Sequence, residues 1–222
     1  MIKTILFDLD GTLLNTLDDL SNSVNHALQQ HGLPLRKVEE IRMFVGNGVR
    51  KLVQRAVPNT LDMPSTEKVF GTFQEHYLQH CYDLTKPYPG ILDLLCQLRK
   101  QGIRTGIVSN KWHTAVEELN QRFFSGWIDV ALGESNNMPR KPSPDRLWAA
   151  MKSLESTPET TLYVGDSDVD ILTAKRAAIS CVSVTWGFRD AEFLKKSGAT
   201  LCIDGPLELL EYLSSIESIP HQ

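Results

Sequence analysis

Short apolar runs alternate with helix-like segments from residue 86 onward, and this alternation limits the possible folds more than any other feature. One apolar run lies earlier, at 5–7, and the later ones lie at 105–108, 128–132, 161–164, 181–184 and 201–203. Segments of helical spacing fall at about 90–101, 112–124, 143–153, 168–177, 190–195 and 206–216. Strands and helices that alternate in this way form a parallel sheet covered on both faces. We therefore expect an α/β fold with a doubly wound parallel sheet.

Residues 15–85 show helical spacing and none of the alternation typical of strands. Apolar residues recur every three or four positions at 17–31, after Asn47-Gly48 and at about 65–82. The following segment, Lys-Pro-Tyr-Pro-Gly, is stiff because proline fixes its own backbone angle. The sequence thus predicts two domains, an α/β core of residues 1–14 and 86–222 and a small all-helical domain, 15–85, inserted after the first strand.

The composition of the 222-residue chain argues against several classes of protein. A formal net charge of −4 is unfavourable for binding the phosphate backbone of nucleic acids. No apolar stretch approaches the roughly 18 residues of a membrane helix, and Asp8 and Asp10 interrupt the N-terminal run that a signal peptide would need. The cysteines, at 81, 96, 181 and 202, have no Cys-x-x-Cys spacing and are typical of reduced core residues in a cytoplasmic protein. We expect no nucleic-acid or membrane partner.

The first apolar run ends at Asp8-Leu9-Asp10-Gly11-Thr12. Open α/β sheets bind their ligands at the carboxyl ends of their strands. Two carboxylates at such a place repel each other unless a cation lies between them or one has a raised pKa. A metal-assisted reaction would meet this need, with one Asp as nucleophile and the other as acid and base. The alternative is a plain polar turn, because Asp-Gly is a common turn dipeptide.

Polar clusters follow three later strands as well. Ser109-Asn110-Lys111 follows the run at 105–108, where a hydroxyl and backbone N–H groups would bind an oxyanion or, alternatively, cap a helix. Lys141 stands in a loop with two prolines before a helix, and lysine suits phosphate binding. The acids of the segment 165–170 suit Mg²⁺ or, equally, the positive end of a helix dipole.

Taken together and in this order, the four clusters resemble the signatures of the haloacid dehalogenase (HAD) superfamily of phosphohydrolases. The matching residues are Asp8-Leu9-Asp10-Gly11-Thr12, Ser109, Lys141 and Gly165-Asp166-Ser167-Asp168-Val169-Asp170. The helical insertion is similar to the small cap of this family, so the resemblance covers essentially the whole chain. It implies a Rossmann-like core and a phosphatase.

The resemblance also implies a role for each matching residue. Asp8 would attack phosphorus and become an aspartyl-phosphate, while Asp10 would act as acid and then as base. Mg²⁺ would bind Asp8, the backbone carbonyl of Asp10, and Asp166. The phosphate would be held by Thr12, Ser109, Asn110 and Lys141, and Asp170 would orient Lys141 or a metal-bound water. An acid at position 10 favours phosphate chemistry, because the dehalogenases of the family lack it. Asn15, where relatives often carry an acid, is a departure.

The segment 44–51 is the one that bears on the substrate. Gly46, Asn47 and Gly48 allow close approach of a ligand to the backbone, and Arg50 suits a carboxylate. This segment resembles that of phosphoglycolate phosphatases, whose substrate carries a carboxylate opposite its phosphate. The alternative is a glycine-rich turn with a solvated Arg50-Lys51 pair.

Several other functions stay open at this stage. The chain could hydrolyse pyrophosphate or a nucleotide monophosphate, transfer the phosphoryl group as a sugar phosphomutase, or bind a ligand without catalysis. His76 and His80 have the spacing of zinc ligands, although we interpret them as a partly buried helix face. The expected partner is a small phosphorylated metabolite, and the chain would act as a monomer or homodimer.

Overall fold

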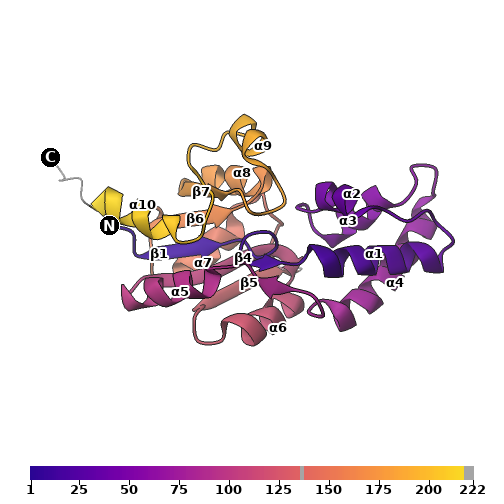
Figure 1. Ribbon diagram of the computed structural model, residues 1–222, viewed down its shortest axis with the longest axis horizontal. Coiled ribbons are helices and arrows are strands. Elements are labelled where there is room, and N and C mark those ends of the chain that lie inside the picture. Colours follow the sequence, from indigo (N-terminus) through magenta and orange to yellow (C-terminus); the bar gives the residue numbers. More distant parts are fainter. Residues whose placement is uncertain (136–137, 218–222) are drawn as a thin grey trace.

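The computed structural model describes residues 1–135 and 138–217. It has an α/β core at one end and a group of four helices at the other (Figure 1). No helix of these residues is both long and apolar enough to cross a membrane.

Six parallel strands form the sheet of the core, in the order β5-β4-β1-β6-β7-β8. Their bounds are β1 Thr4–Phe7, β4 Arg104–Trp112, β5 Val130–Glu134, β6 Thr161–Gly165, β7 Ser180–Val184 and β8 Cys202–Ile203. The predicted doubly wound α/β fold is confirmed. Because β1 lies between β4 and β6, the residues that follow these three strands meet at one edge of the sheet.

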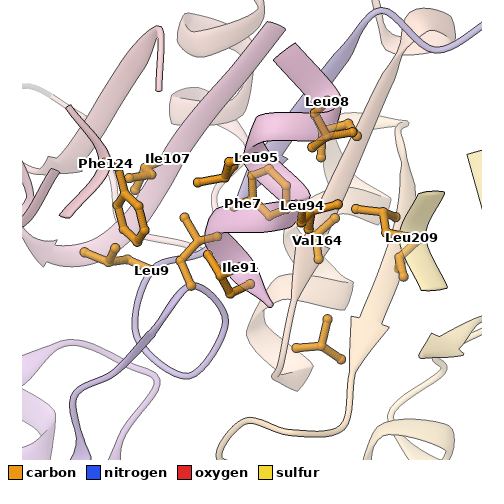
Figure 2. Close-up of a cluster of buried hydrophobic side chains, with 14 of the residues drawn as sticks. Phe7, Leu9, Ile91, Leu94, Leu95, Leu98, Ile107, Phe124, Val164 and Leu209 are labelled. Atoms are coloured by element: carbon orange, nitrogen blue, oxygen red, sulfur yellow. The ribbon is translucent and has the colours of Figure 1, made fainter. Parts of the chain in front are cut away.

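Helices cover both faces of this sheet. They are α5 Ile91–Lys100, α6 His113–Phe124, α7 Asp145–Ser153, α8 Asp168–Ala177, α9 Ala191–Lys196 and α10 Glu208–Glu217, with a short 3-10 turn at Pro158–Thr160. Alternate side chains of β1 enter different layers, since Ile5 and Phe7 belong to one hydrophobic cluster and Leu6 to another. Figure 2 shows the first layer, in which Leu94, Leu95 and Leu98 lie against the sheet beside Phe7. The strand that carries Asp8 is therefore fixed from both sides.

The four remaining helices form the cap, as we call the segment that contains them. They are α1 Leu17–Gln30, α2 Val38–Phe44, α3 Val49–Ala56 and α4 Met63–His80, and they share a hydrophobic cluster of their own. The chain leaves the core through β2 Leu14–Asn15 and returns through β3 Lys86–Pro87. These two short strands pair antiparallel, with Leu14 opposite Pro87, so both crossings lie side by side.

Some expected elements differ from those observed. The apolar pattern did not predict α2, and α4 starts at Met63 because the Asp62 side chain accepts a hydrogen bond from the Ser65 N–H. The strand predicted to stop at Val108 continues to Trp112 as β4, with a shift of register on the way. Ser109, Asn110 and Lys111 were expected to follow the strand, and this expectation was wrong because they lie within it. The N-cap of α6 is Trp112, so neither Ser109 nor Asn110 caps a helix.

Candidate active site

One pocket lies between the edge of the sheet and the cap. The core lines it with residues that follow β1, with part of β4, with Lys141 and with two loops: Asp8, Asp10, Ser109, Asn110, Lys111, Lys141, Asp166, Ser167, Phe188 and Arg189. The cap lines it with Leu20, Val45, Gly46, Gly48, Val49 and Leu52. All four sequence clusters thus meet in one place, whereas the cap side is largely aliphatic.

Asp8 faces a buried lysine. The Nζ atom of Lys141 lies 2.8 Å from Asp8 Oδ1 and donates to Asp170 Oδ1 (2.8 Å) and to the Tyr163 hydroxyl (2.9 Å). Asn110 fixes the backbone of this lysine, because its Oδ1 accepts from the Lys141 N–H and its Nδ2 donates to the Lys141 carbonyl. Both polar groups of the Asn110 side chain are thereby engaged, and its phosphate-binding role stays a prediction.

Negative charge accumulates beside Asp8. Burial raises the pKa of the Asp8 carboxyl group, and Asp170 and Asp10 raise it further, against the opposing effect of the Lys141 ammonium. Burial also raises the pKa of Asp166, to which the charges of Asp170 and Asp8 contribute. Asp166 accepts hydrogen bonds from the Phe188 N–H (2.7 Å) and the Thr12 hydroxyl (3.3 Å), but these neutral donors supply no net positive charge.

These carboxylates fit a divalent cation. One oxygen each of Asp8, Asp166 and Asp170 lies within 4.8 Å of the others, and all three residues are buried. Asp8 Oδ1 has no well-aligned hydrogen-bond donor in the described part of the chain. Carboxylate oxygens are the ligands that Mg²⁺ prefers. Asp170 is already occupied by Lys141, Tyr163 and Ser167, which favours an orienting role over ligation.

Glycines allow the backbone to approach Asp166. Gly11 has a φ of +88°, and a Cβ atom there would lie 2.4 Å from Asp166 Oδ2. A Cβ atom at Gly187 would lie 2.3 Å from the Gly11 carbonyl oxygen and 2.4 Å from Asp166 Cβ. No side chain can be added at either position unless the loops move apart.

Sequence reasoning missed Lys111. Its ammonium donates to Asp10 Oδ1 (3.0 Å) and to the hydroxyl of Tyr77 on α4, and its side chain is only 1% exposed. The sequence did contain a signal for Lys111, because this lysine comes soon after the apolar run of a buried strand. A buried ammonium group without a partner would be unfavourable there. Its partner Asp10 is 101 positions away, so spacing alone could not identify the pair.

Sequence reasoning also missed a pair of arginines that joins cap and core. Arg189, in the loop after β7, donates to the carbonyls of Arg42 and Val45, each at 2.8 Å. Arg42, on α2, donates to the carbonyls of Phe188 (3.0 Å) and Gly187 (2.6 Å). We call this reciprocal set of bonds the arginine clasp. It holds the cap against the loop that contacts Asp166.

The predicted cap residues do not all reach the pocket. Gly46 and Gly48 line it, whereas Asn47 accepts a hydrogen bond from Arg55. Arg50 forms an ion pair with Glu67, stacks over the Phe70 ring at 4.2 Å, and lines a separate pocket. A role of Arg50 toward a substrate carboxylate stays a prediction, and it would need Arg50 to leave Glu67.

The other residues singled out lie away from the reacting centre. Asn15 is in β2, where its side chain accepts a hydrogen bond from the Leu17 N–H at the start of α1. His76 stacks between His26 and His80, and its Nδ1 contacts the Ser23 hydroxyl. Within residues 1–135 and 138–217 the three buried aspartates are the one group placed to hold a metal ion.

Comparison with known proteins agrees with this geometry. Residues 5–184 match the family of haloacid dehalogenase-like hydrolases. Phosphoglycolate phosphatase 1 of Pseudomonas aeruginosa is 33% identical over 217 residues, which cover 94% of this chain and 78% of that protein. The crystal structure of a protein from Lactobacillus delbrueckii subsp. bulgaricus is 36% identical and superimposes with a TM-score of 0.91, over 95% of this chain and 98% of that one. CbbY from Rhodobacter sphaeroides, crystallised in complex with phosphate, is 26% identical with a TM-score of 0.72, over 94% and 96%.

The chain belongs to the haloacid dehalogenase-like hydrolase family. At the end of β1 a pair of aspartates faces two buried lysines under the helical cap. Within the family the chain is a phosphatase, that is, a phosphoric monoester hydrolase.

Proposed function

We propose that this phosphatase requires Mg²⁺, forms an aspartyl-phosphate on Asp8 and hydrolyses 2-phosphoglycolate. The observation that carries the proposal is the convergence of Asp8, Asp10 and two buried lysines in one pocket closed by an aliphatic cap surface. Relatives named phosphoglycolate phosphatase, from Pseudomonas aeruginosa and Aquifex aeolicus, support the choice of substrate.

The two aspartates divide the chemistry between them. A carboxylate oxygen of Asp8 forms a bond to phosphorus while the bond from phosphorus to the ester oxygen breaks, and Asp10 gives its proton to that leaving oxygen. Asp10 then takes a proton from the water molecule that attacks phosphorus, which releases inorganic phosphate and restores Asp8. The proton that Asp10 loses in the first step is thus regained in the second.

The surrounding residues hold the phosphoryl group. Lys141 and Ser109 line the pocket together with Asp8, and the Thr12 hydroxyl donates to Asp166 beside it. These three residues would bind the phosphoryl oxygens, whose charge must be offset during transfer. Bound by Asp8, Asp166 and the backbone carbonyl of Asp10, Mg²⁺ would supply the further positive charge and Lewis acidity. Asp170 would keep Lys141 aimed at Asp8.

The pocket favours a small substrate. Its cap side contributes Leu20, Val45, Val49 and Leu52, whose side chains offer no hydrogen-bond partners to the hydroxyls of a sugar or the edge of a base. This argues for 2-phosphoglycolate over the larger substrates of a sugar phosphomutase or a nucleotidase.

A screen of small phosphoesters tests the proposal. Phosphate release is measured from 2-phosphoglycolate, pyrophosphate, a nucleoside monophosphate and a hexose phosphate, each with Mg²⁺ and with excess chelator. We expect the highest kcat/KM with 2-phosphoglycolate and no turnover under chelation. A higher kcat/KM with any other substrate would refute the assignment of substrate, and full activity under chelation would refute the Mg²⁺ requirement.

A further inference from the structure

Three cationic side chains line the pocket, and their hydrogen-bonding capacity differs. Lys141 directs its ammonium at three groups, on Asp8, Asp170 and Tyr163. The guanidinium of Arg189 is committed to carbonyl oxygens of the cap. The Lys111 ammonium has two partners in the described chain, Asp10 and Tyr77, although an ammonium group can donate three hydrogen bonds. Lys111 therefore retains a donor for a ligand.

The position of Lys111 relative to Asp10 determines which part of a substrate it can reach. Asp10, as the acid, must lie about 3 Å from the ester oxygen that it protonates. The Lys111 Nζ atom lies 3.0 Å from Asp10 Oδ1, and both residues line the pocket. In 2-phosphoglycolate the carboxylate carbon is only two covalent bonds from that same ester oxygen. A substrate whose ester oxygen lies beside Asp10 can therefore place its carboxylate within reach of Lys111.

The surroundings of Lys111 would strengthen such a contact. Its side chain is buried, with Nζ beside the Tyr77 hydroxyl and 4.7 Å from the ring centroid, and the cap side of the pocket includes Leu20, Val49 and Leu52. An ion pair shielded from water in this way is stronger than one at the surface. Lys111 also stands on β4, the strand next to β1 in the sheet.

We propose that Lys111 binds the carboxylate of the substrate and thereby selects short phosphoesters that carry a carboxylate one carbon from the ester oxygen. This inference rests on the proposed function and assigns its specificity to β4 of the core. Arg50, which the sequence indicated for the same task, lies outside the pocket in its pair with Glu67.

The test compares 2-phosphoglycolate with 2-hydroxyethyl phosphate, which carries the same phosphate group but a neutral CH₂OH group in place of the carboxylate. The variants are Lys111→Gln, which keeps a donor for Asp10 without the charge, and Lys111→Met, which removes both. For Lys111→Gln we expect kcat/KM for 2-phosphoglycolate to fall about 10- to 100-fold, the range for a hydrogen bond between charged groups. The value for 2-hydroxyethyl phosphate should fall by a smaller factor, since it reports only the loss of the charge beside Asp10, and most of the additional loss for 2-phosphoglycolate should lie in KM. The matched control is Lys152→Met, at an exposed lysine of α7.

A binding measurement keeps the test valid if turnover is lost or Lys111→Met does not fold. In Asp8→Asn protein, titration calorimetry should give a Kd for 2-phosphoglycolate that Lys111→Gln raises about 10- to 100-fold, with the Kd for 2-hydroxyethyl phosphate unaffected. Tyr77→Phe, which removes only the second partner of Lys111, should preserve the preference for the carboxylate.

Three outcomes would overturn the inference. An equal fall for both substrates would mean that Lys111 only positions Asp10. No selective fall in kcat/KM or affinity would mean that the carboxylate is bound elsewhere, and a selective fall in Arg50→Ala instead would assign it to Arg50. Failure of the proposed function is distinguishable from these outcomes, because the wild-type protein would then have a higher kcat/KM with another phosphoester.

Discussion

Asp8 and Asp166 are carboxylates that folding brings together away from water, and their chemistry follows from that environment. Each lies beside another buried acid, and the Lys141 ammonium lies 2.8 Å from Asp8 Oδ1. The sequence predicts that Asp8 and Asp166 meet although they are 158 positions apart, but it does not show how deeply folding buries them. Three predictions concern single residues of this centre.

Asp8→Asn should abolish turnover and leave the fold intact. The amide cannot form the covalent intermediate, so kcat should fall at least about a thousandfold. The thermal midpoint should not decrease, because the substitution removes one of several crowded negative charges. Steady-state phosphate release and circular dichroism measure the two effects, with Asp93→Asn, at an exposed acid of α5, as control. Substantial turnover by Asp8→Asn would disprove the role of Asp8 as nucleophile.

Mg²⁺ should stabilise the protein more at higher pH. Burial raises the pKa of Asp8 to about 7 and that of Asp166 to about 8, from 3.8. A carboxyl group whose pKa is higher in the folded protein than in the unfolded protein stabilises the folded state. This contribution is complete below the unfolded-state pKa, and it is lost as the pH rises through the folded-state pKa. The metal-free protein should therefore lose stability between about pH 4 and 8, whereas Mg²⁺ needs the ionised carboxylates and should restore it.

Thermal unfolding with Mg²⁺ or chelator, at about pH 5 and about pH 8, measures this effect. Free Mg²⁺ at 100 times its Kd adds about 2.7 kcal/mol, which corresponds to roughly 5–10 °C for a chain of this length. We expect that shift at the higher pH and a much smaller one at the lower. Asp166→Asn should abolish most of the difference. An equal Mg²⁺ shift at both pH values would contradict the prediction.

Gly187→Ala should disturb the centre through its backbone. The new methyl group would meet the Gly11 carbonyl oxygen and Asp166, so we expect a loss of about 1–3 kcal/mol of stability and a fall in kcat. The matched control is Gly71→Ala in α4, where no described atom lies within 4 Å of the added methyl group. That change should stabilise the helix by about 0.5–1 kcal/mol. Chemical denaturation of both variants measures the contrast, and wild-type stability and kcat in Gly187→Ala would refute it.

At the scale of elements, the sequence predicted those whose burial follows a regular period. The strands β1 and β6 were predictable because they are mostly apolar and buried along their whole length, and α1, α3 and α5 because each has one apolar stripe. Helix α2 was not, because Ile41 is its one buried residue while Val38 and Met43 are exposed. The strands β2 and β3 have two residues each, too few for any period, and exist because they pair with each other.

The candidate active site was predictable in part, namely where its residues lie next to elements that the sequence predicts. Asp8, Lys141 and Asp166 could be placed together because each follows a strand or precedes a helix at one edge of the sheet, and Ser109 because it directly follows an apolar run. Lys111 and Arg189 could not, since Asp10 lies 101 positions from Lys111 and Arg42 lies 147 positions from Arg189. The placement of Arg50 depended on Glu67 of α4, a neighbour that only tertiary packing reveals.

At the scale of the whole molecule, the arginine clasp joins the cap to the loop that contacts Asp166. It spans α2 and the loop after β7, and the same loop donates a hydrogen bond to Asp166. Closure by such contacts excludes water from the reacting groups. We therefore expect the clasp to affect every substrate.

Arg189→Ala should lower kcat/KM for 2-phosphoglycolate and 2-hydroxyethyl phosphate by the same factor, about tenfold or more, the range for loss of hydrogen bonds from a charged group. Arg42→Ala should do likewise. The double variant should lose less than the product of the two single losses, because both act on one closed arrangement. Steady-state kinetics of the wild-type protein, the two single variants and the double variant measure this double-mutant cycle. A selective loss for 2-phosphoglycolate in Arg189→Ala would mean that Arg189 contacts the carboxylate itself.

The pairing of β2 with β3 has a consequence for the history and engineering of the chain. Because Leu14 lies opposite Pro87, the two ends of the 15–85 segment are neighbours, and the core sheet does not depend on what is inserted between them. Insertions with adjacent ends are tolerated well by their host domains. A different helical domain, or a short turn, could therefore replace residues 15–85 without disturbing the core sheet. Exchange of this one contiguous stretch of the gene would then change the range of substrates.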